Sequence, residues 1–175
     1  MMERSNEMSG LQAINKVDVK GQDTEFLTFR LGDEDYGVDI LRVQEIRGWE
    51  IVTRIPNSPL YVKGVLNLRG SIVPILDMRQ RLGMGVREYS KDTVVIVLRV
   101  KNGNSQRNVG VVVDEVSDVL NSQIEKIRNT PQFGGGIPVE YITGLVDADG
   151  KMVMLLDVDK LLGKHIDSDL EEDIS

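Results

Sequence analysis

The sequence predicts a mainly β protein, built from two small, strongly bent β-barrels that an internal duplication relates. Three observations support this fold class. Short apolar runs of strand length recur along the chain, whereas only brief helical turns are indicated. Lys63–Gly83 aligns without a gap with Thr143–Gly163, with seven identities in 21 positions. Phe26–Leu31 likewise corresponds to Val94–Arg99. A single β-sandwich is the alternative architecture, but the repeat favours two like halves.

The first strands are expected near the start of the repeat. Thr24–Leu31 alternates between apolar and polar residues, as a half-buried strand does. A turn at Gly32–Asp35 then leads into Tyr36–Ile40, the second strand of a hairpin. Gly48–Pro59 carries two prolines and is expected to be a loop. In the segment Leu41–Arg47, between the second strand and this loop, we expect three apolar side chains to face inward: Leu41, Val43 and Ile46.

The stretch Lys63–Gly83 predicts two strands around a polar turn, followed by a short helix. The turn contains Asn67, Arg69 and Gly70, residues that separate two apolar runs. Asp77 suits the helix N-cap, because its carboxylate can accept the first unpaired backbone N–H groups. Gly83 suits the left-handed residue that ends such a helix.

The second half is predicted to repeat this order. Thr93–Val100 is a nearly continuous apolar strand, which indicates burial on both faces. Lys101–Asn108 is polar and is expected to be a turn, and Val109–Val113 is again a strand. Asp114–Leu120 is predicted as a capped helical turn. Tyr141–Leu156 contains the second copy of the strand–turn–strand unit.

The chain divides into three parts. Residues 1–23 are expected to be a flexible N-terminal segment, and residues 166–175 an acidic C-terminal tail. The domain between them covers residues 24–165, with the second repeat starting near residue 93. Inside it, three consecutive glycines make residues 131–138 the most flexible loop that we expect.

Composition limits the class of protein. The formal charge of −7 and a pI of about 4.8 argue against nucleic-acid binding, which requires a basic face. No cysteine is present, so disulfides, thiolate metal sites and cysteine nucleophiles are excluded. No apolar run approaches the roughly 18 residues of a membrane span, and the N-terminus lacks the apolar core of a signal peptide. A soluble cytoplasmic protein without membrane insertion is therefore expected.

Few residues are suited to catalysis. Asp77 and Asp157 could form a pair of catalytic carboxylates, but their equivalent positions in the repeat favour two helix caps. His165 is the single histidine, and Ser71 has no evident base partner, so neither a metal centre nor an activated nucleophile is predicted. The glycines at 134–136 lack the lysine and hydroxyl residue of a phosphate-binding loop. We therefore do not expect an enzyme.

Differences between the two repeats indicate a binding role for the first. Arg69 corresponds to Asp149 and Asn67 to Asp147, so the common fold does not require the first-repeat residues. Four arginines also fall in this half and could form a basic patch, without the aromatic residues of a nucleic-acid site. A solvated face or a protein-binding surface is the favoured interpretation of that set, which comprises Arg42, Arg47, Arg54 and Arg69.

Several segments resemble the CheW family of bacterial chemotaxis coupling proteins. The resemblance rests on GDEDYGVDILRVQEIRG, TRIPNSPLYVKGVLNLRGSIVPILDMR and the later segments TVVIVL, VGVVVDEVSDVL, IEKIRNTPQF and YITGL, and covers roughly Glu25 to Leu162. The chain departs from the family pattern in KNGNSQRN, which looks longer than usual, and in the triple glycine. The resemblance implies two intertwined, SH3-like five-stranded β-barrel subdomains, no catalytic activity and no cofactor.

The resemblance also implies partners. A CheW-like protein is a cytoplasmic adaptor at membrane-associated arrays, which couples methyl-accepting chemoreceptors to the regulatory domain of the histidine kinase CheA; other CheW copies can join the array rings. A CheW-like scaffold of a non-flagellar chemosensory pathway is the alternative. In the first barrel, the receptor-binding positions are Val43, Glu45, Asn67 and Arg69. The kinase-binding positions in the second barrel are Gly110, Val116 and Gly144. Arg128 and Phe133 match the segment that the family uses in a second contact with the kinase, which completes the array rings.

Overall fold

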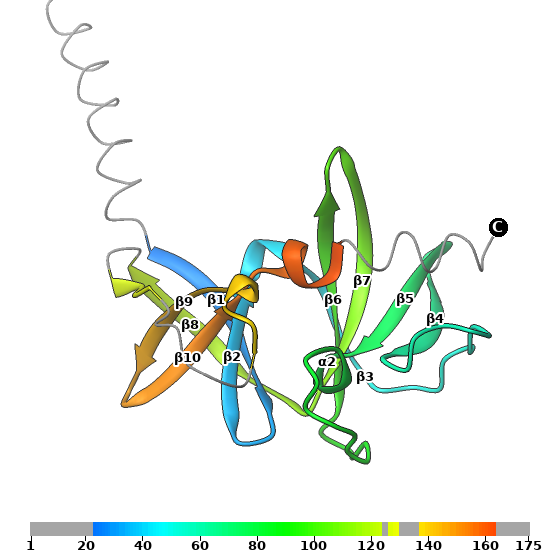
Figure 1. The fold of residues 1–175 in the computed structure, drawn as a ribbon, viewed down its shortest axis with the longest axis horizontal. Helices are drawn as coiled ribbons and strands as arrows, with labels where there is room; N and C mark the ends of the chain where they lie inside the picture. The colour runs from blue at the N-terminus through cyan, green and yellow to red at the C-terminus, as the bar shows by residue number, and fades with distance from the viewer. Residues whose placement is uncertain (1–22, 124–125, 130–136, 164–175) are drawn as a thin grey trace, which may run out of the picture.

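Two curled five-stranded sheets lie side by side in the computed structural model (Figure 1). It describes residues 23–123, 126–129 and 137–163. The first sheet has the strand order β8-β1-β2-β10-β9 and the second β3-β6-β7-β5-β4. The strands of the first sheet are β1 (Asp23–Leu31), β2 (Glu34–Asp39), β8 (Glu115–Gln123), β9 (Ile142–Ala148) and β10 (Lys151–Leu156). Those of the second are β3 (Val43–Gly48), β4 (Val62–Leu68), β5 (Ser71–Asp77), β6 (Val94–Asn102) and β7 (Ser105–Val113).

Helices are short and lie next to the ends of strands. The 3-10 turn η1 (Ile40–Arg42) connects β2 to β3, and η3 (Val139–Tyr141) precedes β9. The helix α2 (Met78–Arg81) follows β5, and a helix over residues 158–163 follows β10. The mainly β fold class with two bent five-stranded units is confirmed. No helix in the described ranges is long and apolar enough to cross a bilayer.

The two repeats exchange strands. The first sheet combines β1 and β2 of the first repeat with β8, β9 and β10 of the second. The second sheet combines β3, β4 and β5 with β6 and β7. Neither sheet is therefore built from a single repeat. Parallel pairing joins the exchanged strands, between β2 and β10 in one sheet and between β5 and β7 in the other.

The strand register confirms the duplication at the level of the backbone. Gly37 pairs with Leu155 in the first sheet, and Gly110 pairs with Ile75 in the second. The pairing also shifts at equivalent places: it skips one residue on β3 between Val43 and Glu45, and one on β8 between Val116 and Asp118. Shared bulges of this kind are built into a fold and indicate one backbone plan used twice.

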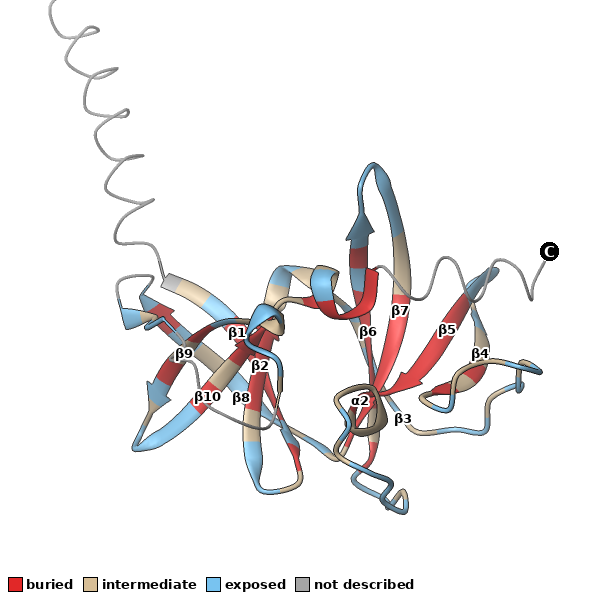
Figure 2. Ribbon diagram, viewed as in Figure 1, coloured by how far each residue is buried: buried red, intermediate tan, exposed pale blue. Residues whose placement is uncertain are grey.

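The largest hydrophobic core belongs to both sheets. It includes Phe29 of β1, Ile96 and Leu98 of β6, and Leu161 from the helix over residues 158–163. Each sheet also has a smaller core of its own, one around Ile75 and one around other residues of β1, β9 and β10. Buried residues consequently gather along the middle of the molecule, and the hairpin tips are exposed (Figure 2). Because the main core is shared, the two barrels stabilise each other.

Two sequence-based expectations for the first half need correction. Leu41 and Ile46 do not face inward: their exposed fractions are 81% and 45%. β3 is a strand with a period of two, so Val43, half-buried against the main core, lies on the opposite face from Ile46. Leu41 lies in η1, where no side chain is buried.

Two expectations for the second half are also wrong. Asp114–Leu120 is not a helical turn, because Glu115–Gln123 forms β8 along β1. Asp114 instead accepts a hydrogen bond from the backbone N–H of Gly32, 2.7 Å away. Most of Lys101–Asn108 is also strand rather than turn, because β6 and β7 pair as far as Asn102 with Ser105.

The helix caps are confirmed. Asp77 Oδ1 accepts the N–H of Gln80 at 3.1 Å, and Asp157 Oδ1 accepts the N–H groups of Asp159 and Lys160 at 3.1 Å each. Gly83 has a φ of 75°, the left-handed conformation expected after α2. Each of the two carboxylates that could have served catalysis thus caps its own helix.

Candidate binding surfaces

The turn between β4 and β5 presents Arg69 to solvent. Arg69 and Gly70 have φ values of 54° and 86°, and Asn67 Oδ1 accepts the N–H of Gly70 at 3.0 Å. The turn of the other barrel is the same, since Asp147 Oδ1 accepts the N–H of Gly150 at 2.8 Å. Asn67 and Asp147 therefore both accept the turn hydrogen bond, and either residue type can occupy this position in the two repeats.

Arg69 differs from its counterpart in a way that the turn does not explain. Asp149 has a φ of 52°, nearly equal to that of Arg69. Asparagine and aspartate tolerate this left-handed region, whereas arginine has no local hydrogen bond to offset the crowding of its Cβ. The Arg69 side chain is exposed and makes no ion pair with any described residue. The backbone conformation thus favours aspartate at this position, and the presence of arginine at residue 69 needs an explanation other than the turn.

The four predicted receptor-binding residues lie in the same barrel but at its two outer strands. Val43 and Glu45 belong to β3, while Asn67 and Arg69 lie at the β4–β5 turn. β6, β7 and β5 separate β3 from β4 in the sheet order. The Glu45 carboxylate is 35% exposed and lies 3.8 Å from Arg47, a distance that gives only a weak ion pair.

The four arginines of the predicted basic patch divide into two groups. Arg42 and Arg47 pair with carboxylates, Arg42 with Asp159 and Arg47 with Glu50. Arg54 and Arg69 are exposed, and neither forms an ion pair within the described part of the chain. A continuous basic face is therefore not present, and two separate unpaired guanidinium groups remain.

The predicted kinase-binding residues are distributed over both barrels. Gly110 lies in β7 of the second sheet, whereas Val116 and Gly144 lie in β8 and β9 of the first. Both glycines are buried: an added Cβ would lie 2.5 Å from Ile75 at the first and 2.5 Å from Ile127 at the second. The remaining two differ in accessibility: Val116 is half-buried and Arg128 exposed. Phe133 and His165 lie outside the described residues.

One contact between the barrels was missed by the sequence analysis. The Arg81 guanidinium lies 5.6 Å from the ring centroid of Tyr61 and 5.2 Å from that of Tyr141. The two tyrosines are equivalent in the repeat. The backbone carbonyl of each tyrosine accepts a hydrogen bond from the backbone N–H of the aspartate that caps the helix of the same barrel. A signal was available, because both tyrosines stand two residues before the aligned segments. Arg81 thus links the two barrels through cation–π contacts.

Ion pairs connect each short helix to a place where the chain crosses between barrels. Asp159 pairs with Arg42 through two hydrogen bonds of 2.8 and 2.7 Å, and also accepts the N–H of Lys101. Burial acts to raise the pKa of Asp159, but the hydrogen bonds from Arg42 and Lys101 outweigh it, so its pKa is lowered. Arg42 belongs to η1, the crossing from the first sheet to the second.

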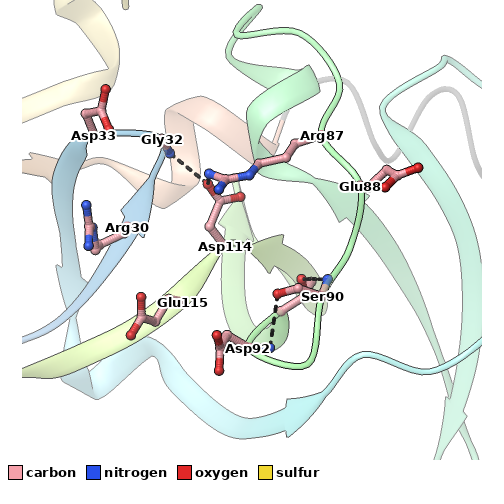
Figure 3. Close-up of a pocket in the computed structure, with 10 residues that line it drawn as sticks. Arg30, Gly32, Asp33, Arg87, Glu88, Ser90, Asp92, Asp114 and Glu115 are labelled. Atoms are coloured by element: carbon pink, nitrogen blue, oxygen red, sulfur yellow. Dashed lines mark hydrogen bonds and ion pairs between the residues drawn. The ribbon is translucent and has the colours of Figure 1, made fainter.

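The other crossing has the opposite polarity. Arg79 of α2, which aligns with Asp159, lies 3.4 Å from Asp114, between β7 and β8. Asp114 also accepts from Arg87 at 3.1 Å and from the Gly32 N–H, beside a hollow of about 210 Å³ (Figure 3). Glu115 and Asp92 lie on the same hollow, which is consequently mostly acidic. Nowhere in the described ranges do three metal-ligating side chains come together.

Two interlocked barrels with exposed turns and strand edges define a binding domain. Sequence comparison places that domain: the CheW-like domain family matches residues 25–165. The chain is 49% identical to the chemotaxis protein CheW of Klebsiella aerogenes, over 90% of this chain and 93% of that protein. It is also 31% identical to the protein FrzA of Myxococcus xanthus, over 79% of this chain and 84% of that one.

A solved structure agrees. The crystal structure of the scaffolding protein TtCheW from Thermoanaerobacter tengcongensis superposes with a TM-score of 0.73 at 30% identity, covering 83% of this chain and 93% of that one. The chain belongs to the CheW family, the non-catalytic adaptor proteins of chemotaxis signalling.

Proposed function

We propose that this adaptor couples methyl-accepting chemoreceptors to the histidine kinase CheA, and thereby supports array assembly and kinase control. The observation that supports binding to the receptor is the conformation and exposure of Arg69. It is exposed, has no ion-pair partner among the described residues, and occupies a left-handed position where the equivalent turn has Asp149. A strained, unpaired charge on a turn fits a residue retained for a partner.

Glu45 and Val43 complete the proposed receptor surface. They lie on β3, whose outer edge pairs with no other strand in the described sheets. For the kinase, the exposed Arg128 is the strongest candidate described, because its side chain makes no described contact while its backbone pairs with Leu145. Gly144 would act by maintaining close packing beneath the Arg128 segment, because an added Cβ would lie 3.0 Å from the Arg128 carbonyl oxygen. Gly110 would act in the same way within the second sheet, against Ile75.

The test is reconstitution with purified components. The protein, a receptor cytoplasmic fragment and CheA are co-sedimented, and CheA autophosphorylation is measured. We expect a ternary assembly with stimulated phosphorylation. Arg69→Ala and Glu45→Ala should weaken receptor binding while leaving the melting temperature nearly unchanged. Asp149→Ala, in the equivalent turn of the other barrel, is the matched control and should bind normally. Failure of the unmodified protein to sediment with both partners would refute the proposal.

The same adaptor role in a non-flagellar chemosensory pathway is the second candidate. The similarity to FrzA, a relative that does not bear the name CheW, is the observation that favours it. Deleting the gene separates the candidates: loss of chemotaxis by flagellated cells supports the first, and an effect on another behaviour with intact swimming supports the second. A fluorescent fusion should gather at receptor arrays in the membrane and become diffuse in the cytoplasm of cells without receptors.

A further inference from the structure

The loop between β3 and β4 forms a second concave surface on the second barrel. It encloses a hollow of about 450 Å³, and the side chain of Gln80 in α2 forms part of the wall. We call this hollow the loop pocket. Its walls include Ile55, Pro59 and Val62, and Arg54 and Lys63 also line it. The volume lies within the range of about 300–1,000 Å³ that is usual for ligand sites.

The loop is held in place before any ligand binds. Thr53 and Val65 exchange backbone hydrogen bonds of 3.1 and 2.8 Å, and the Ser58 hydroxyl donates to the carbonyl of Ile55 at 2.8 Å. The N–H of Val62 donates to the Pro59 carbonyl at 2.9 Å. These bonds, together with the two prolines, fix the shape of the pocket, so little ordering cost remains for binding.

Charge in the loop pocket is of one sign. No carboxylate of a described residue lines it, although the protein as a whole is acidic with a charge of −7. Neither Arg54 nor Lys63 forms an ion pair with any described residue. The pocket therefore contrasts with the mostly acidic hollow beside Asp114, whose central carboxylate is already paired.

One further feature of the loop pocket indicates an apolar contact with its ligand. Leu60 is 88% exposed at its edge, and the equivalent residue in the other repeat is Glu140, so the fold does not require leucine.

From these contacts we infer that the loop pocket binds an acidic segment of a partner protein, in which aspartate or glutamate residues flank an aliphatic side chain. The aliphatic side chain packs on Ile55, Pro59 and Leu60. The carboxylates face Arg54 and Lys63. This inference does not depend on the proposed receptor surface, because it uses neither β3 nor the Arg69 turn.

The test uses the full chain and a capped seven-residue peptide with four acidic residues around a central leucine. Binding is followed by ¹⁵N NMR, and shifts are expected at Ile55, Val62, Lys63 and the side-chain amide of Gln80. Arg54→Glu and Lys63→Glu should each weaken binding by about tenfold or more, as expected when a charged contact becomes repulsive. Lys151→Glu, an exposed charge reversal on β10, is the matched control and should bind the peptide normally.

Two altered peptides test the chemistry. Replacing the acids by their amides, or the leucine by serine, should each weaken binding by about tenfold. Equal binding of the serine peptide would overturn the inference, because only a diffuse charge attraction would remain. Inorganic phosphate at the same charge concentration should not produce the shifts, and if it does, the pocket is an anion site instead.

A shortened chain tests the other available occupant. Residues 166–173 of this protein, IDSDLEED, have the same chemistry. A chain ending at residue 165 should bind the peptide with unchanged affinity if the pocket serves a partner. Affinity increased by about tenfold or more would assign the pocket to the chain's own segment and overturn the partner inference. Arg69→Ala should leave peptide binding intact, so that this inference and the receptor proposal can fail separately.

Discussion

Replacing Arg69 by asparagine should make the protein more stable and a poorer receptor partner. The left-handed conformation costs an ordinary residue about 1–2 kcal/mol, and asparagine avoids part of that cost. Arg69 makes no described ion pair whose loss would count against the substitution. We therefore expect the free energy of unfolding to rise by about 0.5 kcal/mol, which corresponds to about 1–2 °C in melting temperature for a chain of this size.

The effect on binding should have the opposite sign. A hydrogen bond to a charged group contributes about 1.5–3 kcal/mol, so its loss should weaken receptor binding by about 10- to 100-fold. Thermal unfolding followed by circular dichroism gives the first quantity, and calorimetric titration with a receptor cytoplasmic fragment gives the second. Both measurements use the same preparation of the variant.

The β9–β10 turn of the other barrel supplies matched controls, because Asp149 has nearly the same backbone conformation as Arg69. Asp149→Asn should change neither quantity. Asp149→Arg should lower stability by about 0.5 kcal/mol without changing receptor binding. If Arg69→Asn lowered the free energy of unfolding by about 1 kcal/mol or more, Arg69 would stabilise the fold, and the prediction would be refuted. Unchanged receptor binding would equally refute the functional assignment of this turn.

Three further predictions concern stability. Asp159→Asn should lower the free energy of unfolding by about 1–2 kcal/mol at pH 7. Because the folded-state pKa of Asp159 is lowered, its stabilisation is present above the unfolded pKa of about 3.9 and is lost as pH falls through the folded value. The difference from the unmodified protein should shrink between urea titrations at pH 7 and pH 3, and a constant difference would contradict this. Arg81→Leu, which installs the residue found at the equivalent Leu161, should cost about 1–2 kcal/mol by removing both cation–π contacts, and Arg81→Lys should cost less in the same melting assay. Gly110→Ala should lower the free energy of unfolding by about 1–3 kcal/mol, because the new Cβ would lie 2.5 Å from Ile75. Gly48→Ala, where no atom lies within 4 Å of the new Cβ, should be nearly neutral. Equal effects of the two substitutions in urea unfolding would refute this explanation.

The sequence was sufficient to predict the class of fold and the local units. Identities between the copies located the two strand–turn–strand units, the Asp77 cap and the left-handed Gly83 correctly. The residue pattern alone did not indicate which strands are exchanged, because equivalent strands present the same apolar pattern to either barrel; only the family resemblance implied intertwined subdomains. β8 was mistaken for a helical turn because Asp114 suggested a cap, whereas its carboxylate is used by Gly32 and two arginines from other elements. Long-range partners of this kind leave no local signal.

For the candidate site, comparing the copies was informative only where the backbone is the same and the side-chain chemistry differs. Asn67 and Asp147 differ in sequence but accept the same turn hydrogen bond, so this difference carries little functional information. Arg69 and Asp149 share a backbone conformation that suits only the aspartate, so that difference needs a cause outside the fold. The structure thus separates two substitutions that the sequence presents as alike.

Charge differences between the copies also determine which helix packs where. A duplicated fold could in principle place either helix against either crossing, because both have the same backbone plan. Asp159 meets Arg42 at one crossing, and Arg79 meets Asp114 at the other. In the exchanged arrangement Arg79 would face Arg42 and Asp159 would face Asp114, so both contacts would be repulsive. These charges therefore favour the observed assembly of the two barrels over the exchanged arrangement, which identical copies could not do.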